Sequence, residues 1–124
     1  MTRERAARLE RLVSHLPDWL GGVERRPCLL HGDLWPGNVI NAPGGPALID
    51  PAVYYGDREA EIAFTGSFGG FGSKFYAAYE EVWPLAPDWR EREDLYNLYH
   101  LLNHLNLFGE DYGFQVDAVL ARYV

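Results

Sequence analysis

The sequence predicts a mainly helical α+β fold with one short β-hairpin. Apolar residues recur at helical spacing in several segments. Two short apolar runs also stand on either side of a turn rich in proline and glycine, which is the pattern of a hairpin. The chain has 124 residues, the size of one domain, so a single domain over residues 1–124 is expected.

The first half of the chain is expected to hold one helix and the strands. Residues 2–16 carry leucine and valine at helical spacing, and the helix is expected to end near Pro17. Residues 28–30 form an apolar run typical of a short buried strand. Residues 39–40 and 47–49 are the expected hairpin strands, joined by a Pro-Gly-Gly-Pro turn.

The second half of the chain is expected to be helical, with glycines separating the first two helices. Ser73 is expected to cap the second of these helices. Asp88 and Glu91 have the spacing of a capping box for the third, which Gly109 stops. The four helices are expected at residues 58–65, 74–83, 89–108 and 113–123.

The charge of the chain limits its partners. It has 18 acidic and 11 basic residues, and this excess argues against nucleic-acid binding, which depends on clustered lysine and arginine. The single cysteine, Cys28, cannot form an internal disulfide, and no signal-like segment is apparent, so a cytoplasmic location is expected. No apolar run approaches the roughly 20 residues of a membrane helix, so no membrane partner is expected.

The run from His31 to Asn38, with the sequence His-Gly-Asp-Leu-Trp-Pro-Gly-Asn, and the later Asp50 have the spacing of a phosphoryl-transfer centre. In such a centre an Asp accepts the proton of the substrate hydroxyl, an Asn binds magnesium, and a later Asp bridges the metal to the nucleotide phosphates. Asp33, Asn38 and Asp50 fit these roles, and the hairpin brings Asn38 and Asp50 to one end. The alternative is that Asp33 is a turn residue and Asn38 a loop cap.

The other half of such a centre is missing from the sequence. The glycine-rich loop and the lysine-bearing strand that hold ATP are expected well upstream of His31, and only thirty residues precede it. The chain therefore has the features of one lobe of an enzyme.

Three segments in order make the sequence similar to the fructosamine kinase (ketosamine 3-kinase) family, with aminoglycoside phosphotransferases and choline kinases as broader relatives. The resemblance runs from about Pro27 to Val124. It implies the C-terminal lobe of a protein-kinase-like fold, in which the hairpin carries the catalytic and metal loops and the N-terminal nucleotide lobe is absent. The three segments are residues 29–39, 48–59 and 96–109.

The resemblance implies roles for the motif residues. Asp33 is then the catalytic base, and Asn38 and Asp50 are the magnesium ligands. His31 is expected to orient the loop, a role close to that of an ordinary structural histidine. Trp35 is either a wall of the sugar pocket or a buried anchor.

An acidic and basic segment after the metal loop is expected to act as a structural brace. Asp57, Arg58 and Glu59 lock this segment by charge-assisted hydrogen bonds, or else form surface ion pairs. Glu61 stands where the family is expected to have an Asp, and its extra methylene group puts the brace on the catalytic loop in question.

Aromatic and histidine side chains are the remaining candidates for substrate binding. Tyr54 and Tyr55 follow the metal loop. His100 and His104 stand four residues apart on a helix, as in a metal pair, but the zinc-protease signature needs a Glu where Leu101 stands. Packing or substrate contact is therefore favoured over metal binding.

The resemblance implies ATP-dependent phosphorylation of ketosamines, the sugar adducts of amines, at the sugar 3-hydroxyl, which reverses glycation. ATP and Mg²⁺ are the expected cofactors. A nucleotide lobe supplied in trans, or self-association through the exposed lobe face, is the expected protein partner. The alternatives are an orphan lobe that cannot hold ATP productively, or a kinase acting on an aminoglycoside, choline or homoserine.

Overall fold

A computed structural model describes residues 1–22 and 24–124, apart from the side chain of Phe68. Helices hold 61% of the residues and strands 11%, which confirms the mainly helical α+β prediction. The chain forms two compact units, which we call the helical unit (Met1–Glu24 and Asp94–Val124) and the mixed unit (Arg25–Glu93). No helix in the described residues is long and apolar enough to span a membrane.

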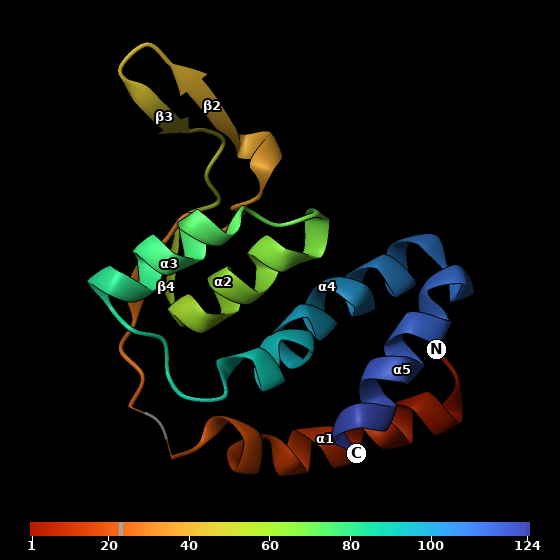
Figure 1. The fold of residues 1–124 in the computed structure, drawn as a ribbon. Coiled ribbons are helices and arrows are strands. Elements are labelled where there is room, and N and C mark those ends of the chain that lie inside the picture. The colour runs from red at the N-terminus through yellow and green to blue at the C-terminus, as the bar shows by residue number, and fades with distance from the viewer. Residues whose placement is uncertain (23) are drawn as a thin grey trace. The chain divides into compact units, whose positions relative to one another are not determined.

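The helical unit contains three helices around one apolar core (Figure 1). They are α1 (Arg3–Leu20), α4 (Glu93–Phe108) and α5 (Gly113–Tyr123). Two aromatic rings of this core pack edge to face, those of Trp19 and Tyr123, with centroids 4.9 Å apart. The buried core residues are Leu12, Leu95, Leu98, Leu105, Val116, Leu120 and Tyr123.

Two predicted helix boundaries in and beside this unit are wrong. Helix α1 continues past Pro17 to Leu20, because the Pro17 carbonyl accepts a 2.8 Å hydrogen bond from the Gly21 amide and closes the last turn. Asp88 caps nothing with its side chain, since its φ of 62° is left-handed and a short 3₁₀ turn (Trp89–Arg92) follows it. The Gly109 stop and helix α5 agree with the prediction.

The mixed unit contains two small antiparallel sheets. Strands β2 (Val39–Ala42) and β3 (Gly45–Leu48) form the predicted hairpin, with pairing that continues to Ala42 and Gly45 and leaves a tighter turn than expected. The predicted strand β1 (Cys28–Leu30) pairs with β4 (Tyr54–Gly56). Strand β4 was not predicted, because it is defined by its pairing with β1, a segment far away in the sequence, and no local pattern marks such a pairing.

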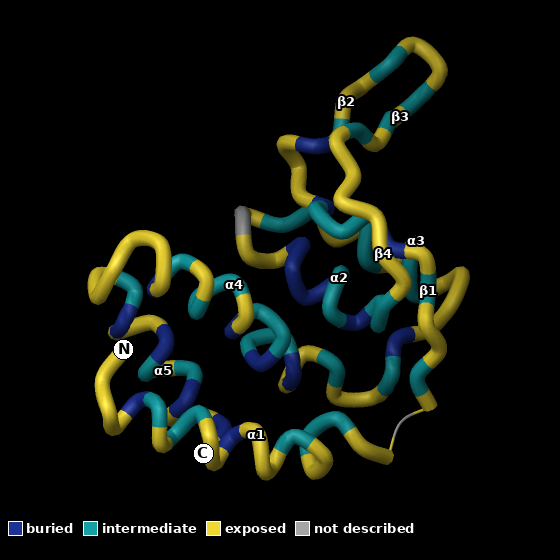
Figure 2. The backbone as a smooth tube through the Cα atoms, turned by 180° about the vertical axis from the view of Figure 1, so that it is seen from behind, coloured by how far each residue is buried: buried dark blue, intermediate teal, exposed yellow. Residues whose placement is uncertain are grey.

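Two helices complete the mixed unit. Helix α2 (Arg58–Thr65) agrees with the prediction, and Asp57 caps it by accepting from the Glu59 amide at 2.9 Å. Helix α3 (Ser73–Val82) begins one residue early, so Ser73 is its first residue and not its cap. Figure 2 shows that α2 is largely buried, whereas β2 and β3 have no buried residue and project from the rest of the mixed unit.

Candidate active site

The candidate site is built on the loop between β1 and β2. His31 follows β1, and its ring joins two parts of the site: Nε2 donates to the Ile49 carbonyl at 2.8 Å, and Nδ1 accepts from the Asp33 amide at 3.2 Å. These partners require the neutral tautomer with hydrogen on Nε2, because a carbonyl only accepts and an amide only donates. Both ring nitrogens are thereby engaged by the backbone.

Asn38 orients Asp33 from the other end of the loop. Its Nδ2 donates to the Asp33 carbonyl at 2.8 Å and to Asp33 Oδ2 at 3.1 Å. Asn38 is buried and Asp33 is half-buried, so this contact is partly shielded from water. Within residues 1–22 and 24–124, no hydrogen bond reaches Asp33 Oδ1 or Asn38 Oδ1, and these two oxygens are available to a ligand.

The hairpin places Asp50 at the same end as Asn38. The Ile49 amide donates to the Asn38 carbonyl at 2.9 Å and extends the β2–β3 ladder to the residue before Asp50. Asp50 is exposed, and its φ of 49° is left-handed, a conformation that costs a non-glycine residue about 1–3 kcal/mol. In the described part of the chain no donor or cation binds its carboxylate.

These donors fit a magnesium ion. The described residues contain no group of three or more His, Cys, Asp and Glu side chains that could hold a metal. Mg²⁺ does not require such a cage, because it usually takes one or two protein carboxylates together with substrate phosphates and water. The available oxygens of Asn38 and Asp50 are of the hard type that this ion prefers.

Gly32 is fixed tightly in the loop. Its φ is 89°, and a Cβ atom at this position would lie 1.9 Å from the Ala52 carbonyl oxygen. The Gly32 amide donates to Glu61 Oε1 at 2.8 Å, and the Ala52 amide donates to the His31 carbonyl at 2.8 Å. The longer side chain of Glu61 thus reaches the loop that carries Asp33.

Trp35 lies across the 3₁₀ turn Pro36–Asn38, which ends the motif. A Cβ atom on Gly37 would meet the indole ring at 2.2 to 2.6 Å, so one face of the ring covers the Gly37 backbone. The residue is 37% exposed. The ring is thus partly exposed and partly packed on the loop backbone, and both of its possible roles stay predictions.

The two tyrosines of β4 are exposed, Tyr54 by 48% and Tyr55 by 74%. Tyr54 pairs with Leu30, the residue before His31. Partial burial raises the pKa of the Tyr54 hydroxyl, and the negative charges of Glu61 and Asp57 raise it further. Tyr54 is therefore close to the carboxylate that holds Gly32.

The acidic and basic segment forms a brace, but with partners that the sequence did not indicate. Asp57 pairs with Arg25, and Glu59 forms a bidentate pair with Arg92. Glu59 is 3% exposed, so the surface-pair alternative is wrong for this residue. Arg58 instead donates to the Trp83 and Pro84 carbonyls at 2.7 and 2.6 Å. Sequence reasoning missed Arg25 and Arg92 because they are 32 and 33 residues from their partners.

His100 and His104 lie on α4, in the helical unit. His104 Nδ1 donates to the His100 carbonyl at 2.6 Å, one turn earlier. The His104 ring packs near the rings of Phe108 and Tyr112, with centroids 5.7 and 5.1 Å away. This arrangement favours packing as the role of His104.

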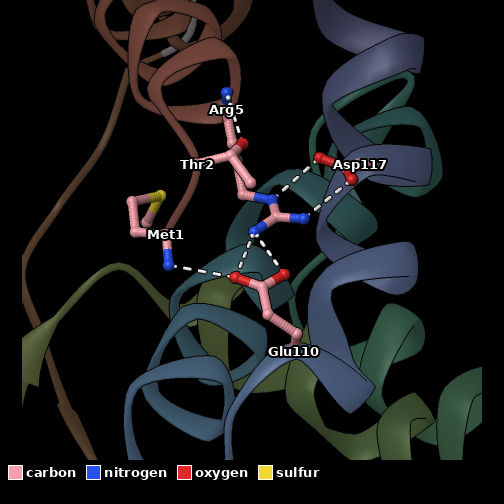
Figure 3. Close-up of polar contacts among 5 residues, drawn as sticks. All are labelled: Met1, Thr2, Arg5, Glu110 and Asp117. Carbon is pink, nitrogen blue, oxygen red and sulfur yellow. Dashed lines mark hydrogen bonds and ion pairs between the residues drawn. The ribbon is translucent and has the colours of Figure 1, made fainter.

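A second charged cluster, also missed by sequence reasoning, ties α1 to the end of the helical unit (Figure 3). The buried Arg5 guanidinium binds both carboxylate oxygens of Asp117 at 2.9 and 2.8 Å and both of Glu110 at 3.0 and 2.9 Å. Hydrogen bonding to Arg5 lowers the pKa of Asp117. The Met1 amine binds Glu110 at 3.0 Å, and the Thr2 hydroxyl accepts from the Arg5 amide at 3.2 Å.

Comparison with known proteins adds to this geometry. A protein from Vibrio parahaemolyticus named a probable ketoamine kinase is 50% identical over 113 residues, which are 91% of this chain and 36% of that protein. A chloroplastic protein-ribulosamine 3-kinase from Oryza sativa is 44% identical over 116 residues, 93% of this chain and 34% of that protein. The chain thus spans about a third of the length of these curated relatives.

A solved structure shares the fold. The crystal structure of a protein from Thermobifida fusca, described as a candidate fructosamine-3-kinase, superposes with a TM-score of 0.84 and 37% sequence identity. The match covers 99% of this chain and 43% of the other. The family model for fructosamine kinase matches residues 2–124. The chain therefore belongs to the fructosamine kinase family.

Proposed function

We propose that this chain supplies the catalytic base and the metal ligands of an ATP-dependent kinase that phosphorylates ketosamines at the sugar 3-hydroxyl. The observation that carries the proposal is the contact of Asn38 with Asp33 at the hairpin end that also holds Asp50. The names of the relatives, ketoamine kinase and protein-ribulosamine 3-kinase, support the substrate class. Phosphorylation at this position starts the removal of the sugar from the amine.

In this proposal Asp33 accepts the proton of the substrate hydroxyl. Asn38 holds Asp33 Oδ2, which leaves Oδ1 as the oxygen that faces the hydroxyl. Asn38 Oδ1 and the Asp50 carboxylate hold Mg²⁺, which when bound neutralises charge on the nucleotide phosphates. His31 keeps the Asp33 and Asp50 segments together through its two ring nitrogens and takes no part in proton transfer.

The substrate side of the site consists of exposed aromatic rings. Trp35, Tyr54 and Tyr55 present rings to solvent in the same unit as Asp33, and such rings bind the apolar faces of sugars. His100 and His104 are weaker candidates for substrate contact, because His104 is occupied by packing.

The nucleotide-binding residues are proposed to come from a separate lobe, because the chain spans about a third of its relatives. Exposed apolar side chains of the mixed unit support this proposal, because a second lobe packed on them would remove them from water. They include Leu29 at 63%, Leu48 at 59% and Ile40 at 47% exposure. Without that lobe we expect self-association, which light scattering measures. A cytoplasmic location is part of the proposal, since the single cysteine forms no internal disulfide.

A single-turnover assay tests the proposal. The chain is mixed with the N-terminal lobe of a relative, ATP and a ribulose- or fructose-lysine adduct, and the phosphorylated sugar is measured. Transfer to the adduct but not to an aminoglycoside, choline or homoserine supports ketosamine specificity. Absence of transfer with the lobe present refutes the proposal, and the orphan-lobe alternative then predicts that calorimetry detects no binding of Mg-ATP.

A further inference from the structure

Both ends of the mixed unit are fastened to the first turn of α2. Arg25 is the first residue of this unit and Arg92 its last but one. Arg25 binds the Asp57 carboxylate, and its Nη1 also lies 3.8 Å from Glu59 Oε2. Arg92 binds both oxygens of Glu59, and its Nη2 meets Oε2 at 3.1 Å. Two cations from opposite ends of the unit thus converge on one helix turn.

The pair of Glu59 and Arg92 is almost completely shielded from water. Glu59 is 3% and Arg92 7% exposed. Arg92 Nη2 also donates to the Pro87 carbonyl at 3.0 Å, so the same guanidinium holds the loop after α3. Loss of one partner leaves the other charge buried without its bidentate partner, and such a change is strongly destabilising. The pair therefore holds the start of α2 in one place.

The same helix carries Glu61, whose carboxylate holds the catalytic loop by the Gly32 amide. Glu61 is two residues beyond Glu59 in a helix of eight residues, so a displacement of the first turn displaces Glu61 as well. The loop has little room to follow, because Gly32 lies against the Ala52 carbonyl. The position of α2 thus sets whether Glu61 meets the loop.

We propose that Arg25 and Arg92 are positioning residues for Asp33. By fixing the first turn of α2 they hold Glu61 against the Gly32 amide, and they thereby set the backbone that presents Asp33. The inference rests on the proposed function, which makes Asp33 the catalytic base. Neither arginine is proposed to touch the substrate.

Arg90 provides a matched control, because it lies in the same 3₁₀ turn as Arg92 but has a different environment. Its side chain is 67% exposed, and its Nη1 lies 3.5 Å from Glu93 Oε1. A substitution of Arg90 removes the same charge from the same turn without touching Glu59. The comparison of R90M with R92M therefore separates the buried contacts of Arg92, with Glu59 and the Pro87 carbonyl, from the loss of one positive charge.

Amide hydrogen exchange of the whole chain, followed by nuclear magnetic resonance, tests the inference. In R92M the Gly32 amide is expected to exchange about tenfold faster than in the wild type, relative to the amides of the β1–β4 ladder. E61Q gives the reference for a weakened Gly32 contact, and R90M is expected to match the wild type. R92K keeps the charge but not the bidentate fork, so its Gly32 exchange rate is expected to lie between those of R92M and the wild type.

If R92M fails to fold, R92K and R25M carry the test, because each leaves part of the network in place. A Gly32 exchange rate equal to that of the wild type in every folded variant of Arg25 and Arg92 overturns the inference. That result leaves the proposed function intact, since the transfer assay measures it separately. The converse result is a wild type that transfers no phosphate while Gly32 exchanges faster in R92M than in the wild type. That result removes the proposed function and leaves the structural link between Arg92 and the loop.

Discussion

The Asn38 side chain bonds to Asp33 twice, once at the main-chain carbonyl and once at the carboxylate. One amide therefore fixes both the backbone of the proposed base and the rotation of its carboxyl group. Because Asn38 uses only its Nδ2 for this, its Oδ1 stays available for a cation. A single residue thus links the proposed proton acceptor to the proposed metal site.

Replacement of Asp33 by Asn is expected to lower the rate of phosphate transfer by about 10²–10⁴-fold, the usual contribution of a general base. The fold is expected to persist, since the amide keeps the size of the carboxylate. The KM for the ketosamine is expected to change little. Steady-state kinetics of the reconstituted enzyme measure both constants, and an unchanged kcat contradicts the assignment of Asp33.

Gly32→Ala is expected to destabilise the chain for two reasons. The positive φ costs an alanine about 1–2 kcal/mol. The new methyl group also meets the Ala52 carbonyl, and overpacking of this kind costs about 1–3 kcal/mol more. Urea unfolding measures the sum.

Gly69→Ala is the control for this substitution. Gly69 has a similar φ of 83°, but among the described residues no atom lies within 4 Å of a Cβ placed there. Gly69→Ala is therefore expected to lower the free energy of unfolding only by the cost of the positive φ. Equal losses of stability in the two variants contradict the clash at Ala52.

Addition of Mg²⁺ is expected to slow hydrogen exchange in the β2–β3 hairpin. The hairpin has no buried residue, and an isolated two-stranded hairpin is marginally stable in water. A cation held by Asn38 and Asp50 joins its two strands at their base. Exchange of the Ile40 amide at increasing Mg²⁺ measures the effect, with the α5 amides as internal reference.

D50N is expected to abolish this response, because it removes the charged ligand. D88N is the matched control, since Asp50 and Asp88 are both aspartates with a positive φ, 49° and 62°, in the mixed unit. A response in D50N equal to that of the wild type excludes Asp50 as the ligand.

Acid is expected to weaken the contact between Arg5 and Asp117. Hydrogen bonding to Arg5 lowers the pKa of Asp117 below its ordinary value of 3.8, so the unfolded chain takes up the proton first as the pH falls. This contribution to stability is complete above the ordinary value and is lost as the pH falls through the lowered one. It is modest, because the Asp117 side chain is 44% exposed and solvent screens the pair.

Thermal unfolding of the wild type and D117N between pH 2 and 6 tests this expectation, the range being set by the ordinary carboxyl pKa of about 4. The difference in melting temperature is expected to shrink toward the acid end. A difference that stays constant with pH contradicts the role of the charged carboxylate.

Patterns within a short segment of sequence predicted the elements that form from neighbouring residues. Helix α5 and the hairpin follow from short-range spacing, and both agree with the structure. Strand β4 depends on pairing with β1, whose partner residues Leu30 and Tyr54 are far apart in the sequence. No local signal marks such a pairing. Asp88 failed as a cap because its backbone conformation overrides its side-chain preference.

The contacts of the candidate site also differ in whether neighbouring or distant residues form them. Asp33 and Asn38 are five residues apart, so their contact was accessible from the motif. The partners of Glu59 were not, because the buried pair with Arg92 forms only after the chain has folded back over 33 residues. Burial makes the loss of either partner costly, and burial is a property of the whole unit rather than of the segment.

The fastening of Arg25 and Arg92 to the same helix turn also bears on how the mixed unit is joined to the rest of the chain. The mixed unit is a continuous stretch whose entry and exit points lie side by side, and the helical unit is split around it into two segments. This is the topology of an inserted module, whose two junctions with the remainder of the chain lie close together. Asp33, Asn38 and Asp50 all lie between these junctions, so the residues of the proposed site belong to one continuous module.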